Sequence, residues 1–319
     1  MMKAIVLKGL NELYYEHIEN QSTTGLELIK ILASSLNHRD LWIKKGQYAG
    51  IKFPMVLGSD GVGLDENNNL VIMNPGVHWG EKTAYQSKDY QILGLPKYGT
   101  FSNECWVQKS QIFPMPTHLT MEEAAALPLA GVTAFRALFK RANLKTSDKV
   151  LISGIGGGVA LFAMQFAIAH GCEVCVTSSK EWKLDIAKKM GAKDGKLYTH
   201  DSFVKSFQSE IGGFDVIVDS AGGEGFSNLL KLANPGGRIV FYGGTNGNIQ
   251  INPQTVFWKQ LSILGSTMGS DQDFAEMLEF VNFHKIIPRV DSIFPINEFD
   301  KAFKKMESGD QFGKIVLKV

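Results

Sequence analysis

This chain of 319 residues has few cysteines, almost no net charge and no long apolar run. Three cysteines cannot form a dense disulfide framework, which favours a reducing compartment. Lys and Arg number 33 against 32 Asp and Glu, so charge gives no reason to expect nucleic acid or a membrane surface as partner. No apolar run is long enough to span a bilayer, and residues 1–8 are typical of a strand and not of a signal peptide. We therefore expect a cytoplasmic protein with a small neutral or locally anionic ligand.

Two of the cysteines, Cys172 and Cys175, form a C-x-x-C string. This spacing is found in redox and metal sites. Here both residues fall on an expected strand, where side chains three positions apart point to opposite faces of the sheet. The sequence therefore favours two separate buried thiols over a shared site.

The pattern of strand-like and helix-like segments changes near residue 121. Before it, short β-like runs with many Gly, Pro and Asn predict a β-rich domain. After it, apolar strands alternate with helical patterns, which predicts a parallel sheet covered by helices on both faces. Residues 271–319 break the alternation with an amphipathic helix, a second helical stretch at 299–306 and a final strand at 314–319, so we expect this tail to return to the first domain. The expected domains are residues 1–122 with 266–319, and residues 123–265, with a cleft between the two bodies.

The alternating region predicts five strands and three helices, whose ends are marked by glycine and proline. Gly171 and Gly191 are expected just beyond the first two helices, and Pro235-Gly236-Gly237 is expected to close the third. The predicted strands are 150–152, 173–177, 214–219, 238–242 and 261–264, and the predicted helices are 159–170, 181–190 and 224–233.

A glycine-rich stretch, Ser153–Ala160, follows the first of these strands and opens the first helix. Glycines allow a tight turn and a close approach of the backbone to a pyrophosphate, and the helix N-terminus favours the anion. A glycine string alone is weak evidence, but strand, loop and apolar helix in this order, with the next strand ending about twenty residues later, predict a dinucleotide site.

The end of that next strand indicates which dinucleotide binds. An acidic residue there would bind a ribose 2′-hydroxyl, whereas a 2′-phosphate needs donors and positive charge. The sequence from Thr177 is TSSKEWK, and its hydroxyls with Lys180 and Lys183 favour NADPH. Glu181 is evidence against NADPH, because it could bind a ribose hydroxyl. Alternatively, Lys180, Glu181 and Lys183 serve only to cap and solvate the following helix.

Five stretches of the chain resemble the medium-chain dehydrogenase/reductase superfamily, in particular its zinc-free quinone oxidoreductase-like branch, to which zeta-crystallin belongs. The resemblance covers essentially the full length. It implies an α/β protein with a GroES-like β-rich catalytic domain and a doubly wound Rossmann nucleotide-binding domain. The matching stretches are 36–48 (LNHRDLWIKKGQY), 53–63 (FPMVLGSDGVG), 124–134 (AAALPLAGVTA), 153–160 (SGIGGGVA) and 236–244 (GGRIVFYGG).

The zinc-dependent members of that superfamily hold a catalytic metal with Cys, His and Cys. At the matching places this chain has Asn37, Ser59 and Leu129, which supply neither thiolate nor imidazole. The region that holds structural zinc in such enzymes, residues 73–106 here, contains only Cys105. We therefore expect no zinc site of either kind.

Without a metal, fewer kinds of hydride acceptor are expected, because no bound cation stabilises the alkoxide that forms from a simple carbonyl. An acceptor that delocalises its own charge, such as a quinone or an α,β-unsaturated carbonyl, needs only modest hydrogen-bond donors. The sequence and the resemblance thus favour an NADPH-dependent reductase of quinones, enones or enoyl thioesters. A zinc-free reductase of activated aldehydes or ketones and a non-catalytic NADPH-binding protein stay open as alternatives.

Three residues are the candidates for catalysis. The resemblance places Asn37, Asp40 and Tyr48 near the nicotinamide, where Asn37 could donate a hydrogen bond to the acceptor oxygen and Tyr48 could supply a proton. Asn37 and Asp40 could instead cap a helix that begins at Leu41, and Tyr48 could simply pack. For His38 a surface or capping role is favoured.

The resemblance also implies cofactor contacts and a homodimer. In the family, the edge strand of the sheet pairs with its copy in a second subunit; here Phe257 and Trp258 precede that strand, and burial of these aromatics under the nicotinamide loop is the alternative. Ala160 stands where family members usually have Gly, which the helix tolerates. The implied cofactor residues are Thr133, Gly154, Gly157, Gly158, Val159, Ser178, Ser179, Lys183, Tyr198, Ser220, Gly243, Gly244, Thr245, Ser266, Thr267 and Met268.

Overall fold

The computed structural model describes residues 1–19 and 24–319, which form two compact units. One unit consists of Met1–Val132 and Met268–Val319, and the other of Thr133–Thr267. The C-terminal residues belong to the first unit, where the last strand pairs with a strand from the first 35 residues. The compact units change over at residues 132/133 and 267/268, later than the expected domain limits at 122/123 and 265/266.

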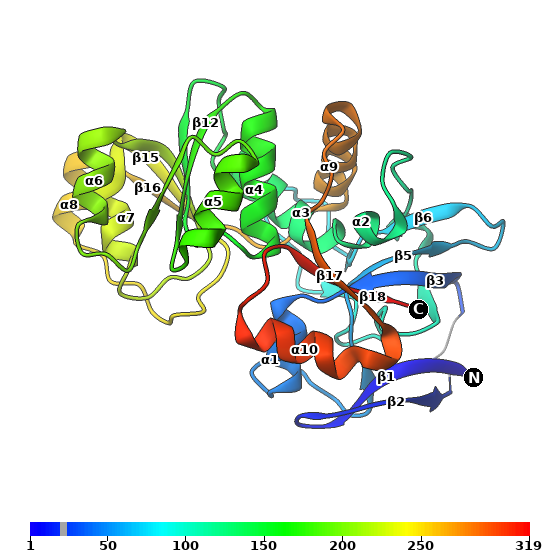
Figure 1. The fold of residues 1–319 in the computed structure, drawn as a ribbon. Helices are drawn as coiled ribbons and strands as arrows, with labels where there is room; N and C mark the ends of the chain where they lie inside the picture. Colours follow the sequence, from blue (N-terminus) through cyan, green and yellow to red (C-terminus); the bar gives the residue numbers. More distant parts are fainter. Residues whose placement is uncertain (20–23) are drawn as a thin grey trace. The chain divides into compact units, whose positions relative to one another are not determined.

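The unit of residues 133–267 is built on a six-stranded parallel sheet with the order β13-β12-β11-β14-β15-β16 (Figure 1). Numbered along the chain this is 3-2-1-4-5-6, the order of a doubly wound dinucleotide-binding fold. The predicted parallel sheet is therefore confirmed. Its strands are β11 (Lys149–Ile152), β12 (Glu173–Ser178), β13 (Asp194–Leu197), β14 (Phe214–Asp219), β15 (Ala233–Phe241) and β16 (Ser262–Gly265).

Helices cover both faces of this sheet, as Figure 1 shows. The helix α4 is apolar almost all round, since it is buried along most of its length. Gly171 and Gly191 follow the C-caps of α4 and α5 with φ of +98° and +107°, as predicted. The helices are α4 (Gly158–Ala169), α5 (Glu181–Lys189), α6 (Phe203–Glu210), α7 (Phe226–Leu232) and α8 (Pro253–Lys259), preceded by α3 (Pro128–Phe135) and a π-helical segment, η2 (Arg136–Arg141).

Two details of the pattern were wrong. The third predicted helix ends at Leu232, and Pro235, Gly236 and Gly237 lie within β15 instead of closing the helix. Ala233 pairs with Phe214 at the start of the strand, and a register shift follows in which Gly236 takes a φ of +74°. The sequence analysis also missed β13, α6 and α8, all of which have eight residues or fewer.

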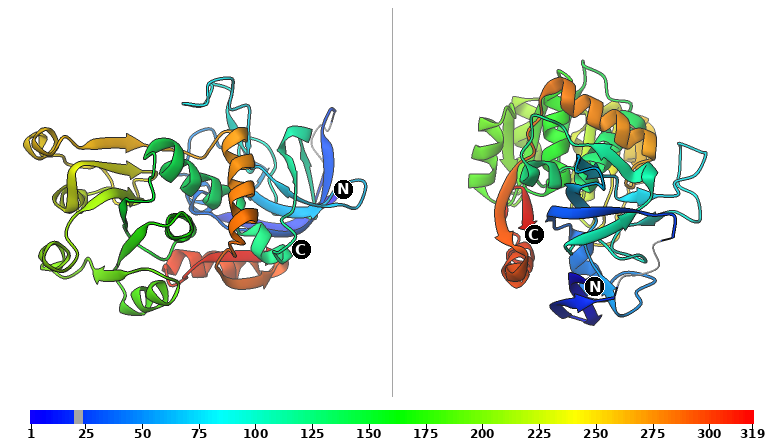
Figure 2. Two further views of the ribbon diagram at one scale, coloured as in Figure 1. Left: turned by 90° about the horizontal axis from the view of Figure 1, so that it is seen from above. Right: turned by 90° about the vertical axis from the view of Figure 1, so that its right-hand side faces the viewer.

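The other unit is β-rich, as predicted. A seven-stranded sheet has the order β10-β6-β5-β3-β18-β17, with β9 also paired to β3. The C-terminal strand β18 pairs with β3, and β17 pairs with β18. Figure 2 shows this C-terminal stretch in red near the blue N-terminal part of the chain. The strands are β1 (Met2–Gly9), β2 (Glu12–Ile18), β3 (Glu27–Ser35), β4 (Met55–Val56), β5 (Asp60–Leu64), β6 (Leu70–Met73), β7 (Gly76–Val77), β8 (Gln91–Ile92), β9 (Glu104–Val107), β10 (Ile112–Pro114), β17 (Val290–Pro295) and β18 (Lys314–Lys318).

Helices complete this unit. One hydrophobic cluster of its core is formed mainly by β1, β4, α10 and β18, and another includes residues of β3, β6 and β9. No helix in the part of the chain that the structure describes is both long enough and apolar enough to cross a membrane. The helical segments are α1 (His38–Lys44), α2 (Met121–Ala125), α9 (Asp271–His284) and α10 (Phe299–Ser308), with 3-10 turns η1 (Lys109–Gln111) and η3 (Ile296–Glu298).

Candidate functional site

Asn37 and Asp40 start the helix α1. Asn37 is the N-cap, and its backbone N–H donates to Asp40 Oδ2 at 2.8 Å. The helix therefore begins at His38, three residues before the expected start at Leu41, because the capping contact fixes the first turn. His38 is exposed at the first helical position, in agreement with the surface role favoured for it.

The side chain of Asn37 is held by two opposite charges. Its Nδ2 donates to Asp60 Oδ2 at 2.9 Å, and its Oδ1 accepts from Lys314 Nζ at 2.6 Å. An ammonium can only donate and a carboxylate can only accept, so the two neighbours fix which way the amide faces. Asn37 thus keeps one N–H for a further partner, and its oxygen is already engaged.

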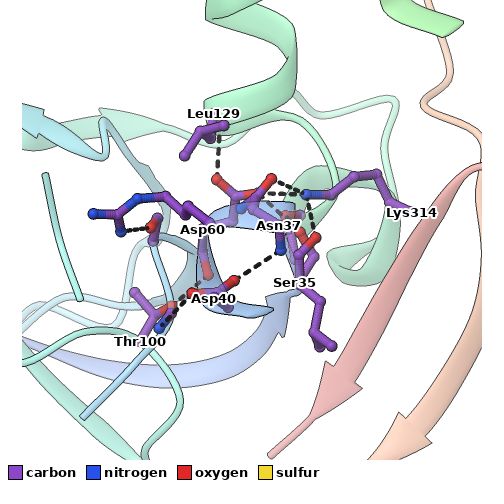
Figure 3. A network of polar contacts seen from close by, with 12 residues as sticks. Ser35, Asn37, Asp40, Asp60, Thr100, Leu129 and Lys314 are labelled. Carbon is purple, nitrogen blue, oxygen red and sulfur yellow. Dashed lines mark hydrogen bonds and ion pairs between the residues drawn. The ribbon is translucent and has the colours of Figure 1, made fainter. Parts of the chain in front are cut away.

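Asp60 is the centre of this polar network (Figure 3). Its Oδ2 accepts from Asn37 and from Lys314 Nζ at 2.8 Å and lies 2.9 Å from Ser35 Oγ. Its Oδ1 accepts from the backbone N–H of Leu129 at 2.8 Å. Asp60 is fully buried and the Lys314 side chain is 5% exposed, so this is a buried ion pair whose polar atoms are satisfied.

Asp40 lies in the interior of the same unit as Asp60. It is fully buried, and burial raises the pKa of its carboxyl to about 6, although the nearby Arg39 charge and the Asn37 N–H oppose this shift. Its Oδ1 accepts from Gly58 N at 3.3 Å. Asp40 therefore ties α1 to the segment that carries Ser59 and Asp60.

Arg39 binds Ser59, which stands at the second of the three places matched to zinc ligands. Its Nη1 donates to Ser59 Oγ at 2.6 Å and to the Leu93 carbonyl at 2.7 Å. Ser59, which is fully buried, in turn donates to the Leu93 carbonyl at 2.9 Å. The hydroxyl of Ser59 is thus occupied as donor and as acceptor.

The structure brings Asn37, Ser59 and Leu129 together around one set of partners. Asn37 and Leu129 both bind Asp60, and Ser59 directly precedes Asp60 in the chain. The amide oxygen is taken by Lys314, the hydroxyl by Arg39, and Leu129 has no donor atom in its side chain. This set of side chains does not fit a zinc ion, which prefers thiolate, imidazole and free carboxylate.

Tyr48 lies apart from the Asp60 network. It follows α1, is 37% exposed, and has its ring centroid 5.4 Å from the Arg39 guanidinium carbon. Tyr48 is therefore partly open to a ligand while one contact ties it to α1.

The glycine loop joins β11 to α4 in the other unit. Gly154 and Gly156 have φ of +71° and +138°, which other residues rarely adopt. The N–H groups of Gly154 and Ile155 donate to Thr177 Oγ1 at 3.0 Å and to Thr177 O at 2.7 Å, so the loop is fixed to the end of β12. Gly157 is the N-cap of α4 without a side-chain hydrogen bond.

The loop has the geometry of an anion cradle. A Cβ atom at Gly154 or Gly157 would meet no atom within 4 Å, so space is open beside the loop. At Gly156 such an atom would lie 3.0 Å from Lys183 Nζ, which places the ammonium of this buried lysine next to the loop. The first turn of α4 adds N–H groups and a positive dipole end. A pyrophosphate-containing cofactor fits these residues.

The other cofactor residues expected in this unit, apart from Thr133 in α3, lie at the carboxyl ends of parallel strands, where ligands of such sheets bind. The Ser178 hydroxyl is buried and accepts from Lys180 N at 3.1 Å, whereas Ser179 is exposed. Met268 belongs to the other compact unit. Gly158 and Val159 open α4; Ser178 and Ser179 end or follow β12; Tyr198 follows β13, Ser220 follows β14, Gly243, Gly244 and Thr245 follow β15, and Ser266 and Thr267 follow β16.

Of the two C-x-x-C residues, Cys175 lies on β12 as expected, whereas Cys172 directly precedes this strand, which begins at Glu173. Cys172 and Cys175 are free and buried, and burial raises the pKa of each thiol to about 11. Such thiols are protonated at neutral pH and poor nucleophiles. Among residues 1–19 and 24–319, no three His, Cys, Asp or Glu side chains are grouped as they would be around a metal ion.

The sequence analysis missed Asp60, Lys314 and Arg39. One signal was available: Lys314 starts the strand β18 directly before three apolar residues, and a lysine that is buried with such a run needs a buried partner. The partner itself could not be found, since Asp60 is 254 positions away in the chain.

Two family models match this chain. "Alcohol dehydrogenase GroES-like domain" matches residues 24–117, and "Zinc-binding dehydrogenase" matches residues 158–282. The second match contains none of Asn37, Ser59 and Leu129, so it does not bear on the residues at these places.

Curated relatives cover nearly the whole chain. The zinc-type alcohol dehydrogenase-like protein YogA of Leptosphaeria maculans is 33% identical, over 92% of this chain and 90% of its own. The quinone oxidoreductase of Mus musculus is 29% identical over 91% and 88%, and the acryloyl-coenzyme A reductase of Metallosphaera sedula is 28% identical over 99% of both chains. A crystal structure of an NAD-dependent alcohol dehydrogenase superposes with a TM-score of 0.91 at 31% identity, over the full length of both chains.

Proposed function

We propose that this chain, which belongs to the medium-chain dehydrogenase/reductase family, transfers hydride from NADPH to a quinone or an α,β-unsaturated carbonyl. The observation that carries the proposal is the orientation of Asn37. Its amide oxygen is engaged by Lys314, so only an N–H is left to meet a substrate. A group that can only donate suits a carbonyl oxygen on which negative charge develops.

The residues around Asn37 would stabilise that charge without moving. Asn37 donates to the acceptor oxygen, while Asp60 and Lys314 hold the amide in place, so little reorganisation is needed during the reaction. Tyr48 contacts the acceptor and is the proposed proton donor. The role proposed for Asp40 is to position Asn37: its carboxylate accepts from Asn37 N and so fixes the start of α1.

Bound NADPH would supply the hydride. The N–H groups of the glycine loop and of the α4 N-terminus would hold its pyrophosphate, with Gly154, Gly157, Gly158 and Val159 as the contact residues. Ser178, Ser179, Lys183 and Tyr198 would hold the 2′-phosphate end. The remaining residues of the proposed site are Thr133, Ser220, Gly243, Gly244, Thr245, Ser266, Thr267 and Met268.

Preference for NADPH over NADH is supported by positive charge. Lys183 Nζ lies beside the glycine loop, and Lys180 precedes α5. Two observations oppose it: Glu181 is exposed in the first turn of α5, and the similar solved alcohol dehydrogenase is an NAD-dependent one. A lysine that reaches the 2′-phosphate favours NADPH, whereas one that contacts only the pyrophosphate serves both cofactors alike.

The reaction is proposed to proceed without zinc, because Asn37, Ser59 and Leu129 are a poor donor set for this ion. An acceptor that delocalises its charge, as quinones and enoyl groups do, compensates for the missing Lewis acid. This choice of acceptor agrees with the names of the mouse and Metallosphaera relatives.

A cytoplasmic homodimer is the proposed state of the protein. β16 is an edge strand, and the preceding helix α8 leaves Phe257 58% and Trp258 79% exposed. Exposed aromatics beside an unpaired strand edge are typical of an interface. The alternative of a Trp258 buried under the nicotinamide loop is wrong.

The test is NADPH oxidation at 340 nm with three acceptors: a benzoquinone, a 2-alkenal and a saturated aldehyde of the same length. We expect turnover with the first two and none with the third, unchanged after treatment with a zinc chelator. Turnover with the saturated aldehyde alone would replace the proposal by an aldehyde reductase. NADPH binding without turnover of any acceptor would leave a non-catalytic binding protein.

A further inference from the structure

Arg39 carries a buried positive charge that the proposed reaction does not use. It is 6% exposed, and both bonds of its Nη1, to Ser59 Oγ and to the Leu93 carbonyl, fix the plane of the guanidinium. Its Nε has no hydrogen-bond partner in the part of the chain that the structure describes. A planar cation held in this way has one face to offer to an aromatic ring.

Tyr48 supplies that ring. Its centroid lies 5.4 Å from the guanidinium carbon of Arg39. Tyr48 sits outside the regular elements, two residues after Gly46, whose φ is +74°. A side chain on such a loop has no strand or helix to fix it, so contacts determine where the ring stays.

The contact is strong enough to matter for a loop residue. A cation–π pair contributes more when the cation is removed from water, as Arg39 is, and guanidinium stacks better than ammonium. Tyr48 still keeps 37% of its surface exposed, so part of the ring is open to a ligand.

We infer that Arg39 is a positioning residue that holds the Tyr48 ring as a flat support for the acceptor, and that this support favours flat ring acceptors such as quinones over short alkenals. A flat ring gains a stacking contact on Tyr48 that a short chain cannot make to the same extent. The inference rests on the proposed function, since it concerns how that reaction selects its acceptor.

The experiment places Arg39→Lys in three backgrounds: the wild-type chain, Tyr48→Phe and Tyr48→Leu. Lysine keeps the charge but replaces the planar guanidinium by a compact ammonium. Phenylalanine keeps the ring and leucine removes it. We expect Arg39→Lys to raise the KM for a benzoquinone on the order of fivefold in the wild-type and Tyr48→Phe backgrounds, and not at all in Tyr48→Leu. The KM for a 2-alkenal should change by less than half as much. Arg289→Lys, at an exposed arginine of the same unit, is the matched control and should leave kcat and KM unchanged.

The outcomes separate the inference from the proposed function. A wild-type chain that reduces neither acceptor overturns the proposed function, and the inference with it. A wild-type chain that turns over normally, with the same effect of Arg39→Lys in the Tyr48→Leu background, overturns the inference alone, because Arg39 then acts without the ring. If Arg39→Lys does not fold, Tyr48→Leu alone decides: an unchanged KM for the quinone overturns the inference, and a selective rise supports it.

Discussion

Lys314 Nζ lies 2.6 Å from the side-chain oxygen of Asn37, and this contact decides which way the Asn37 amide faces. The same ammonium lies 2.8 Å from Asp60 Oδ2 and 2.7 Å from the Leu36 carbonyl. A residue from the last strand thus orients a residue that precedes the first helix. The arrangement leaves one amide N–H of Asn37 without either of these charged partners, at one of the three places matched to zinc ligands.

Removal of the Asn37 amide should slow the reaction and leave the cofactor in place. We expect Asn37→Ala to lower kcat about tenfold or more, because one oriented donor to the developing charge is lost. Binding of NADPH, measured by fluorescence titration, should not change. Asn67→Ala, at an exposed asparagine of the same unit, is the control. An Asn37→Ala variant with wild-type kcat would remove Asn37 from the mechanism.

Removal of the Lys314 charge should destabilise the β-rich unit. Lys314→Met leaves the fully buried Asp60 without its counter-charge, and breaking a buried pair in this way costs roughly 3–5 kcal/mol. Lys318→Met is the control, because Lys318 is 58% exposed and its pair with Glu122 is worth about 0–1 kcal/mol. Urea unfolding measures both. Equal midpoints for the two variants would contradict a structural role for the buried pair.

The buried carboxyl of Asp40 should make stability depend on pH. Its pKa rises from 3.8 to about 6 on folding, so its contribution is fully present below pH 3.8 and is lost as pH rises through 6. Asp40→Asn keeps an acceptor for the Asn37 N–H and removes the titration. We expect the stability of the wild type relative to Asp40→Asn to fall by roughly 3 kcal/mol between pH 3.5 and 7.

A second aspartate gives the opposite sign as a comparison. Hydrogen bonds from Asn69 and Asn67 lower the pKa of Asp65, so its contribution is present above the ordinary value and is lost as pH falls. The Asp65→Asn difference should therefore have the reverse slope in the acid range. A flat difference between wild type and Asp40→Asn would show that Asp40 does not titrate near pH 6.

Lys183 should govern the choice of cofactor. Lys183→Ala removes the ammonium beside Gly156, and we expect the KM for NADPH to rise roughly tenfold, the effect of about 1.4 kcal/mol, with little change for NADH. Lys189→Ala, at an exposed position of the same helix, should alter neither. Equal rises for both cofactors would assign Lys183 to the pyrophosphate and not to the 2′-phosphate.

The exposed aromatics of α8 should control association. With Trp258→Glu, a charge replaces a side chain that is 79% exposed, and we expect the homodimer to dissociate at micromolar concentration. Light scattering after size exclusion measures the mass. Phe283→Glu, at an 81% exposed aromatic of α9, is the control and should leave the mass unchanged. A wild-type monomer at the same concentration would rule out the proposed dimer.

Local patterns were sufficient for the strand, glycine loop and helix at the start of the nucleotide-binding unit. The run from Lys149 to Gly171 is continuous in sequence, so strand, loop and helix could be predicted from glycine spacing and apolar periodicity. The short elements β13, α6 and α8 were missed because four to eight residues give too little periodicity. The pairing order of the strands depends on contacts between segments far apart in the chain, which residue periodicity does not encode.

The sequence by itself determined that Asn37, Ser59 and Leu129 cannot supply thiolate or imidazole, because residue type alone decides ligand chemistry. It also determined the anion-binding loop, because glycine conformations and helix starts are local properties. Only the tertiary structure decided that Lys314 and Asp60 meet at Asn37 and that the Arg39 guanidinium lies over the Tyr48 ring. The orientation of the amide comes from an ion pair between residues 254 positions apart, and burial makes that pairing necessary, since neither charge is stable alone in the interior.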